Sequence, residues 1–174
     1  LDCSYTTLTS LDVSTNTALT TLYCHDNRNL KIINAGGNTT LKTLHCYTTP
    51  LISLNITGAT GLQILKIDHN FSLTSLDVST NTALTYLECS YTGLTSLNVN
   101  GATALKYLYC NNNLLPVSSV DNILASLVTH GLISGSVNLQ GGRQGVFNAA
   151  PSSKAPGSNY DTLKNIRGWL VLTN

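Results

Sequence analysis

A short pattern, Leu-x-Cys, recurs along most of this 174-residue chain. It returns every 21 or 22 residues, with its cysteines at Cys3, Cys24, Cys46, Cys89 and Cys110. Ile67 fills the one missing copy, in Leu65-Lys66-Ile67, so the position requires a buried apolar group rather than sulfur. Self-similarity at a fixed period indicates a repeat architecture in which stacked units share one continuous core. We therefore predict a column of free, buried thiols and no disulfide framework, which the odd number of cysteines also favours.

A finer pattern, Leu-x-x-Leu-x-apolar, divides each repeat into two half-repeats. Its ten copies begin 10 or 11 residues apart, at Leu8, Leu19, Leu30, Leu41, Leu51, Leu62, Leu73, Leu84, Leu94 and Leu105. Half-repeats with Cys, such as 84–89, alternate with half-repeats that read Leu-Asp-Val or Leu-Asn-Val, such as 73–79. The apolar alternation indicates short strands, and neither kind of half-repeat has helical spacing. Both sides of each coil should therefore be extended, and the solenoid should curve only gently.

The repeat resembles the leucine-rich repeat family, whose core segment reads Leu-x-x-Leu-x-Leu-x-x-Asn-x-Leu. Residues 105–115 match this segment, and the resemblance covers residues 1–115. The Asn of the motif is kept at Asn27, Asn70 and Asn113. A Thr whose hydroxyl should satisfy the turning backbone replaces it at Thr6, Thr49 and Thr92. Cys in the third apolar position is similar to the cysteine ladder of some internalin-like bacterial surface proteins. The resemblance implies a β-rich leucine-rich-repeat solenoid of about five to six repeats, with parallel strands on its concave face.

The period stops after Asn113, and residues 116–174 are predicted to form a small α/β cap. A helix should start at Ser118 or Ser119, end at Gly131 and bury Val120, Ile123, Leu124 and Leu127. Residues 136–139 read as a strand, 143–159 as a loop, 160–168 as a short helix and 169–173 as a final strand. We expect the two strands to pair and the first helix to cover the last repeat, because the end of a solenoid otherwise exposes core leucines. The chain opens in the middle of a repeat, so we predict an N-terminally truncated, monomeric solenoid whose uncapped end is where chains could stack.

Charge and hydropathy argue against several kinds of partner. The chain has 9 basic and 8 acidic residues, so nothing indicates nucleic acid or an anionic membrane as a ligand. No apolar run reaches the roughly 18 residues that a membrane-spanning helix needs, so membrane insertion is not expected. No cofactor is predicted.

Large polar and aromatic side chains gather in the outward positions of the Cys-bearing half-repeats. Seven of the eight tyrosines and three of the four histidines lie there, whereas the other half-repeats offer mostly Thr, Ser, Asp and Asn. Tyrosine gives a large, rigid contact area with a polar tip, which suits recognition of a protein or a glycan. The predicted ligand-binding surface consists of Tyr23, His25, His45, Tyr47, Lys66, Asp68, Tyr86, Glu88, Tyr107 and Tyr109. The alternative is that aromatic residues are there only because they favour strands and stack across them.

Other chemistry at these positions is less favoured. His25, His45 and Asp68 face outward on neighbouring strands, but they occupy different positions and would be too diagonal to hold a metal. A Ser-His-Asp catalytic group on an open strand face would lack a pocket and an oxyanion site. Lys66 and Glu88 share a position on adjacent strands and should form an exposed ion pair of small energetic value. Redox activity of the cysteines would need exposed thiolates, which a dry column disfavours.

The family resemblance implies a non-catalytic module for adhesion or recognition, in a secreted or cell-surface bacterial protein. Its ligand would be a protein or glycan bound at the concave strand face. Two alternatives stay open: a passive spacer or stalk, and the recruiting segment of a larger multidomain protein.

Overall fold

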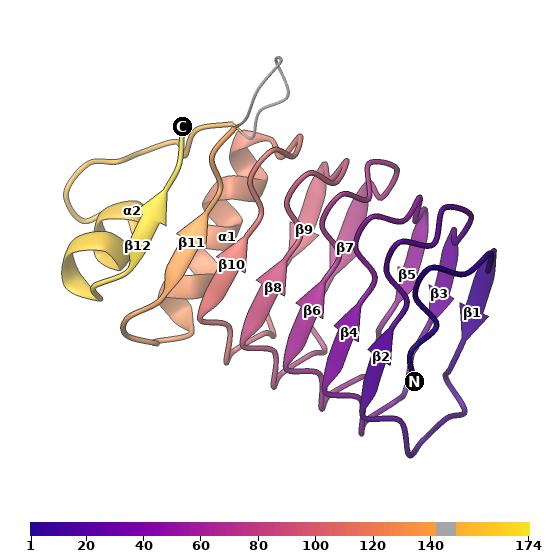
Figure 1. Cartoon of the computed structure of the whole chain (residues 1–174). Helices are drawn as coiled ribbons and strands as arrows, with labels where there is room; N and C mark the ends of the chain where they lie inside the picture. Colours follow the sequence, from indigo (N-terminus) through magenta and orange to yellow (C-terminus); the bar gives the residue numbers. More distant parts are fainter. Residues whose placement is uncertain (142–148) are drawn as a thin grey trace.

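The chain winds into a solenoid of stacked coils in the computed structural model, which describes residues 1–141 and 149–174 and, of Ile166, only the backbone (Figure 1). From β1 to β10, three-residue strands alternate along the chain between the opposite side and the sheet at the front of Figure 1. The front sheet has seven strands: β2 (Thr21–Tyr23), β4 (Thr43–His45), β6 (Ile64–Lys66), β8 (Tyr86–Glu88), β10 (Tyr107–Tyr109), β11 (Ser136–Asn138) and β12 (Leu170–Leu172).

The opposite side carries two smaller sheets. One contains β1 (Ser10–Asp12), β3 (Ile32–Asn34) and β5 (Ser53–Asn55), and the other contains β7 (Ser75–Asp77) and β9 (Ser96–Asn98). Every strand pair on both sides is parallel and in register. The predicted leucine-rich-repeat solenoid with extended segments on both sides is therefore confirmed.

The cysteine column lies in the core, as predicted. Cys24, Cys46, Cys89 and Cys110 are fully buried, Ile67 occupies the missing place with 0% exposure, and all five cysteines are free. Burial raises the pKa of the Cys46 and Cys89 thiols well above the ordinary value, so these groups stay protonated and unreactive. In the first coil, Cys3 is only half-buried, because no earlier coil covers it in this structure.

Thr and Asn at the motif's Asn position act in pairs across neighbouring coils. Thr49 Oγ1 lies 2.8 Å from the Cys46 carbonyl and 2.6 Å from Asn70 Oδ1. Asn70 Nδ2 then donates to the carbonyls of Cys46 and Ile67, in two coils at once. The same pairing joins Thr6 to Asn27 and Thr92 to Asn113. The expectation that the Thr hydroxyl serves the turning backbone is confirmed, and the structural unit is a pair of coils.

The C-terminal part continues the front sheet and closes its end (Figure 1). Helix α1 (Val117–Thr129) buries the four predicted apolar residues, and β11 and β12 pair as expected, in parallel. The helix begins one to two residues earlier than predicted, because Pro116 supplies the N-cap with φ −70° and neither serine caps it. A short α2 (Asn159–Asp161) runs into a single π-helical turn, η2 (Thr162–Ile166). The predicted loop at 143–159 lies partly outside the described residues.

Candidate functional site

The last position of each strand on the opposite side is occupied by a structural side chain. Asp or Asn stands there in all five strands and accepts a hydrogen bond from the backbone N–H two residues later. Two examples are Asp77, which accepts from Ser79 at 2.8 Å, and Asn98, which accepts from Asn100 at 3.1 Å. The others are Asp12, Asn34 and Asn55. These short polar side chains are needed for the turns that follow the strands. Few other residue types can therefore stand at this position, which limits how this side of the solenoid could be adapted to a ligand.

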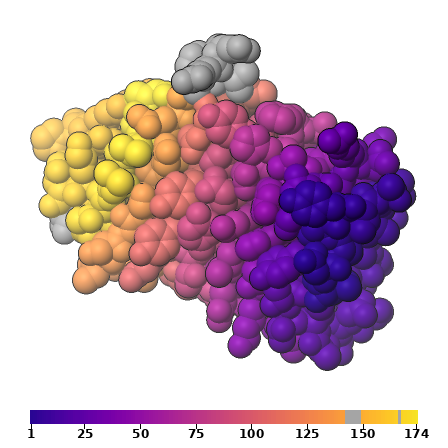
Figure 2. Space-filling view, viewed as in Figure 1, coloured from indigo at the N-terminus to yellow at the C-terminus, as the bar shows by residue number. Residues whose placement is uncertain are grey.

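On the front sheet, Asn138 at the end of β11 makes the same turn bond, accepting from Gln140 N–H at 3.1 Å, but the first five strands carry larger side chains at this position. Its occupants in the first five strands are Tyr23, His45, Lys66, Glu88 and Tyr109. The five remaining predicted residues lie on the same face, either at the start of a strand or two residues after its end: His25, Tyr47, Asp68, Tyr86 and Tyr107. Parallel pairing in register brings all ten into one continuous surface along the array. Figure 2 shows the molecule from the side of this sheet, with the coils following one another in sequence order.

A shallow cavity of about 310 Å³ lies in the middle of this surface. Tyr47, Lys66, Asp68, Tyr86 and Glu88 line it, and all five belong to the predicted set. Lys66 Nζ lies 5.5 Å from the centre of the Tyr86 ring, within the range of a cation–π contact. We name this cavity with its five lining residues the central cup.

The predicted ion pair between Lys66 and Glu88 is wrong. Within residues 1–141 and 149–174, the ion pairs with N···O under 4.0 Å join His25 to Asp26 and His69 to Asp68. The Glu88 carboxylate instead accepts from Ser90 Oγ at 2.6 Å, while Lys66 lies over Tyr86. The Ser90 hydroxyl is only two residues from Glu88, so the chain itself holds it close to the carboxylate. The Lys66 side chain is long and flexible and would lose rotamer freedom to reach the same oxygen, so the bond from Ser90 is favoured.

Burial controls the protonation of the groups in and beside the central cup. Burial raises the pKa of the Glu88 carboxyl, although the hydrogen bonds from Ser90 act in the other direction. Burial and the nearby Glu88 charge raise the pKa of Tyr86 to about 12. The pKa of His45 is lowered, first by burial and then by the Lys66 charge, so this ring favours its neutral form. The cup therefore presents partly desolvated polar groups with shifted pKa values, which are common at binding sites.

Aromatic rings flank the central cup along the array. On one side, His25 and Tyr47 stack with ring centres 4.4 Å apart and an angle of 6°. On the other side, the Tyr86 ring centre lies 5.6 Å from that of Tyr109 and 6.2 Å from that of Tyr107. These contacts hold the rings in place, so little conformational entropy is left to lose when a ligand binds.

The predicted binding set left out a second row of exposed aromatic residues, although the sequence already places Tyr5 and Tyr91 in outward positions. Tyr5, Phe71 and Tyr91 are 77%, 68% and 40% exposed, and Tyr91 stacks on His69 at 4.9 Å. Most of the row occupies the position two residues after the Cys slot, where every coil has a positive φ between 53° and 59° without glycine: Tyr5, Asp26, Thr48, His69, Tyr91 and Asn112. This conformation costs non-glycine residues about 1 kcal/mol or more, and a backbone bond to the next coil holds it, as from Tyr91 N–H to the Asn111 carbonyl. The period marks this position in the sequence, but only the structure shows its backbone shape.

No group of three or more His, Cys, Asp or Glu side chains suited to a metal ion occurs in the described part of the chain. The histidine considered as a metal ligand, His25, is paired with Asp26 at 2.8 Å instead of meeting Asp68. Of the helices in residues 1–141 and 149–174, none has both the length and the apolar character to cross a membrane.

The fold and the buried thiol column define a leucine-rich-repeat solenoid of the cysteine-ladder class. No protein-family model and no curated protein sequence matches the chain. Among solved structures, it is similar to the functional domain of InlJ from Listeria monocytogenes, which includes a cysteine ladder. The TM-score is 0.68 at 28% sequence identity, over 100% of this chain and 34% of that chain. The resemblance to cysteine-ladder internalins is confirmed, and this chain spans about a third of the InlJ structure's length.

Proposed function

We propose that this chain is a non-catalytic recognition module of a secreted or cell-surface bacterial protein. It binds a protein or glycan at the outer face of the seven-stranded sheet, centred on the central cup. The similarity to a functional domain of InlJ supports the surface role and the extracellular placement. The candidate site is a shallow cup on an open sheet face, a shape that supports binding rather than catalysis.

One observation carries the proposal: the two sides of the same coil differ in what their strands expose. Strand preference alone would place aromatic rings on both sides, since both are parallel three-residue strands. The five strands of the opposite side have the sequences Ser-Leu-Asp, Ile-Ile-Asn or Ser-Leu-Asn. The first five strands of the front sheet have the sequences Thr-Leu-Tyr, Thr-Leu-His, Ile-Leu-Lys, Tyr-Leu-Glu and Tyr-Leu-Tyr. A general preference of aromatic residues for strands therefore does not explain their distribution, because they occur on the front sheet and not on the strands of the opposite side.

The test is a triple change of Tyr86, Tyr107 and Tyr109 to Ala, followed by binding screens against immobilised glycans and extracellular host proteins. The matched control replaces Ile32 and Ile52 with Ala, because both are exposed and lie on the opposite side. A ligand bound by the native chain and the control should lose at least about tenfold in affinity for the triple variant, as expected when central aromatic residues are truncated. Far-UV circular dichroism checks that the fold is kept. Unchanged binding of the ligand by the triple variant would show that this face is not the site.

A further inference from the structure

The ladder of the opposite side ends at β9, where the chain turns into helix α1. Within each of the two smaller sheets, a strand is bonded by the next strand of its own sheet: in the second sheet, Val78 N–H donates to the Asn98 carbonyl at 2.9 Å, whereas β5 and β7 belong to different sheets. The equivalent group on β9 is Val99 N–H, and within residues 1–141 and 149–174 it has no such partner, because β9 pairs with β7 alone. The equivalent carbonyl one coil earlier, that of Thr74, accepts a hydrogen bond from Thr95 N–H at 2.9 Å. The Thr95 carbonyl itself has no such donor from a following strand among the described residues. Strand β9 therefore has one open hydrogen-bonding edge.

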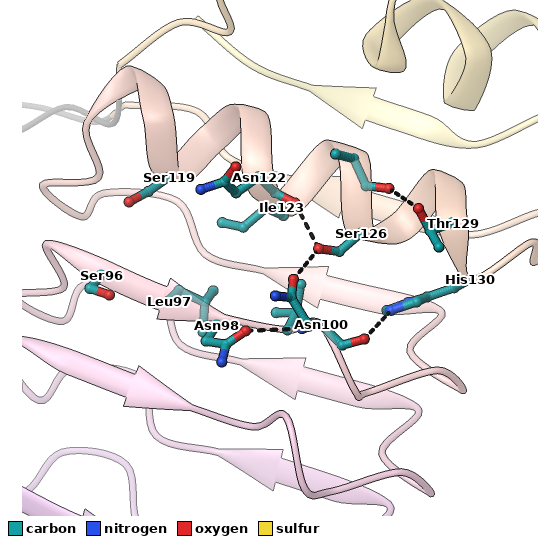
Figure 3. Close-up of a pocket in the computed structure, with 12 residues that line it drawn as sticks. Ser96, Leu97, Asn98, Asn100, Ser119, Asn122, Ile123, Ser126, Thr129 and His130 are labelled. Atoms are coloured by element: carbon teal, nitrogen blue, oxygen red, sulfur yellow. Dashed lines mark hydrogen bonds between the residues drawn. The ribbon is translucent and has the colours of Figure 1, made fainter.

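A groove of about 540 Å³ lies between this open edge and α1. Figure 3 shows Ser119, Asn122 and Ser126 of the helix lying across the groove from the strand residues around Leu97. At one end, Asn100 ties the two walls together. Its side-chain oxygen accepts from Ser126 Oγ at 2.5 Å, and its carbonyl lies 3.1 Å from His130 Nε2. The helix thus covers the core without taking the place of the missing strand.

The chemistry of the groove fits an uncharged, extended peptide. No Asp, Glu, Lys or Arg is among its lining residues, so neither a charged peptide nor an ionic ligand finds a counter-charge there. Natural edge strands are blunted by charges, proline, a bulge, short length or a covering helix; Ser-Leu-Asn in β9 has no charge and no proline, and its protection comes from its three-residue length and from α1 across the groove. A strand added to an open edge gains main-chain hydrogen bonds, and hydroxyl and amide groups on the facing helix can bond its polar side chains. A sugar would find a single aromatic ring to stack on among the lining residues, the imidazole of His130.

We propose that the β9–α1 groove is a second binding site, which takes an uncharged extended segment of a partner protein as a parallel strand on β9. The site is separate from the central cup: β9 belongs to the opposite side of the solenoid, and no residue lines both cavities. The occupant donates from its backbone to the Thr95 carbonyl and accepts from Val99 N–H. Its register follows that of β9 on β7, with Ser75 opposite Ser96.

The probe is the capped hexapeptide Ac-Leu-Thr-Ser-Leu-Asn-Val-NH2, the sequence of residues 94–99, because it already pairs in this register with β7. In the coils that pair, the first strand residue donates to the previous coil, as Tyr86 N–H does to the Gln63 carbonyl at 3.1 Å. N-methylation of the peptide's Ser should therefore abolish binding, whereas N-methylation of its central Leu, whose N–H points to the other edge, should leave binding within about threefold. Binding to the whole chain is followed by the shifts of backbone amide signals in NMR spectra.

A protein variant provides the second arm. Asn122→Trp places a large ring in the groove from an exposed helix position, and Val117→Trp is the matched control on a helix face outside the groove. We expect the peptide to shift the Leu97 and Val99 amide signals, and Asn122→Trp to weaken binding at least about tenfold while Val117→Trp does not.

Absence of any shift at millimolar peptide, equal binding of the two N-methylated peptides, or equal binding to both Trp variants would overturn the proposal. So would a neutral glycan that competes with the peptide for the native chain. Because the Tyr-to-Ala changes of the front sheet leave this groove intact, failure here and failure at the central cup are distinguishable.

Discussion

Replacing Asn70 with Ala should be among the most damaging single changes in the solenoid. The Asn70 side chain is fully buried and serves groups in two coils. Its Oδ1 accepts from Leu51 N–H at 3.1 Å, and its Nδ2 donates to the carbonyls of Cys46 and Ile67 at 2.9 and 2.7 Å. After truncation, the Thr49 hydroxyl can turn fully to the Cys46 carbonyl, which lies 2.8 Å away. Two buried backbone groups, Leu51 N–H and the Ile67 carbonyl, are then left without a partner.

The magnitude follows from those two groups. A buried donor or acceptor that loses its partner costs about 1–3 kcal/mol, so the free energy of unfolding should fall by roughly 2–6 kcal/mol. For a native state that is stable by only about 5–15 kcal/mol, this is a large share. Asn16→Ala is the matched control, because this exposed side chain makes no hydrogen bond within the described residues, and it should change stability by less than about 0.5 kcal/mol.

Urea unfolding at 25 °C measures both variants, followed by far-UV circular dichroism and by the fluorescence of Trp169, the single tryptophan. The dichroism reports on the whole array, and Trp169 lies in the C-terminal part, so agreement of the two midpoints tests whether the coils unfold together. A loss below about 1 kcal/mol for Asn70→Ala, or a loss as large for Asn16→Ala, would refute the view that the Thr–Asn pairs hold neighbouring coils together.

Two further predictions concern ionisation. Burial raises the pKa of the Glu88 carboxyl above the ordinary value of 4.5, so the folded state binds a proton that the unfolded chain has already lost. The stability of the native chain should therefore decline relative to Glu88→Gln as the pH rises above that ordinary value, since Gln keeps the acceptor for Ser90; parallel stability profiles of the two proteins would contradict this. In the native state, a thiol reagent should modify only the half-buried Cys3 quickly and reach all five cysteines once the chain is unfolded in urea. Fast modification of more than one thiol before unfolding would show that the column is open.

Much of the fold could be predicted because the solenoid is built from local rules that repeat. A period of 21 or 22 residues fixes which side chains stack, and the position of Cys in Leu-x-Cys shows which side chains point inward. The neighbours of those residues must point outward, and the ten predicted surface residues therefore share one face. Pro116 and the early start of α1 show where prediction was less sharp, because the N-cap of a helix depends on how the chain leaves the preceding coil.

The sequence by itself determined the repeat, the buried thiol column and the face on which the large side chains lie, because each of these follows from alternation within one short strand. Only the tertiary structure decided how side chains on different coils meet. Lys66 packs over the Tyr86 ring, and Glu88 accepts a hydrogen bond from Ser90. The repeat period places several partners equally near, so side-chain entropy and desolvation decide which contacts form. The Thr49–Asn70 bond spans two coils, and the left-handed turns depend on the coil that follows them. The sequence predicted that a helix covers the last repeat, but only the structure shows the groove that α1 leaves beside β9.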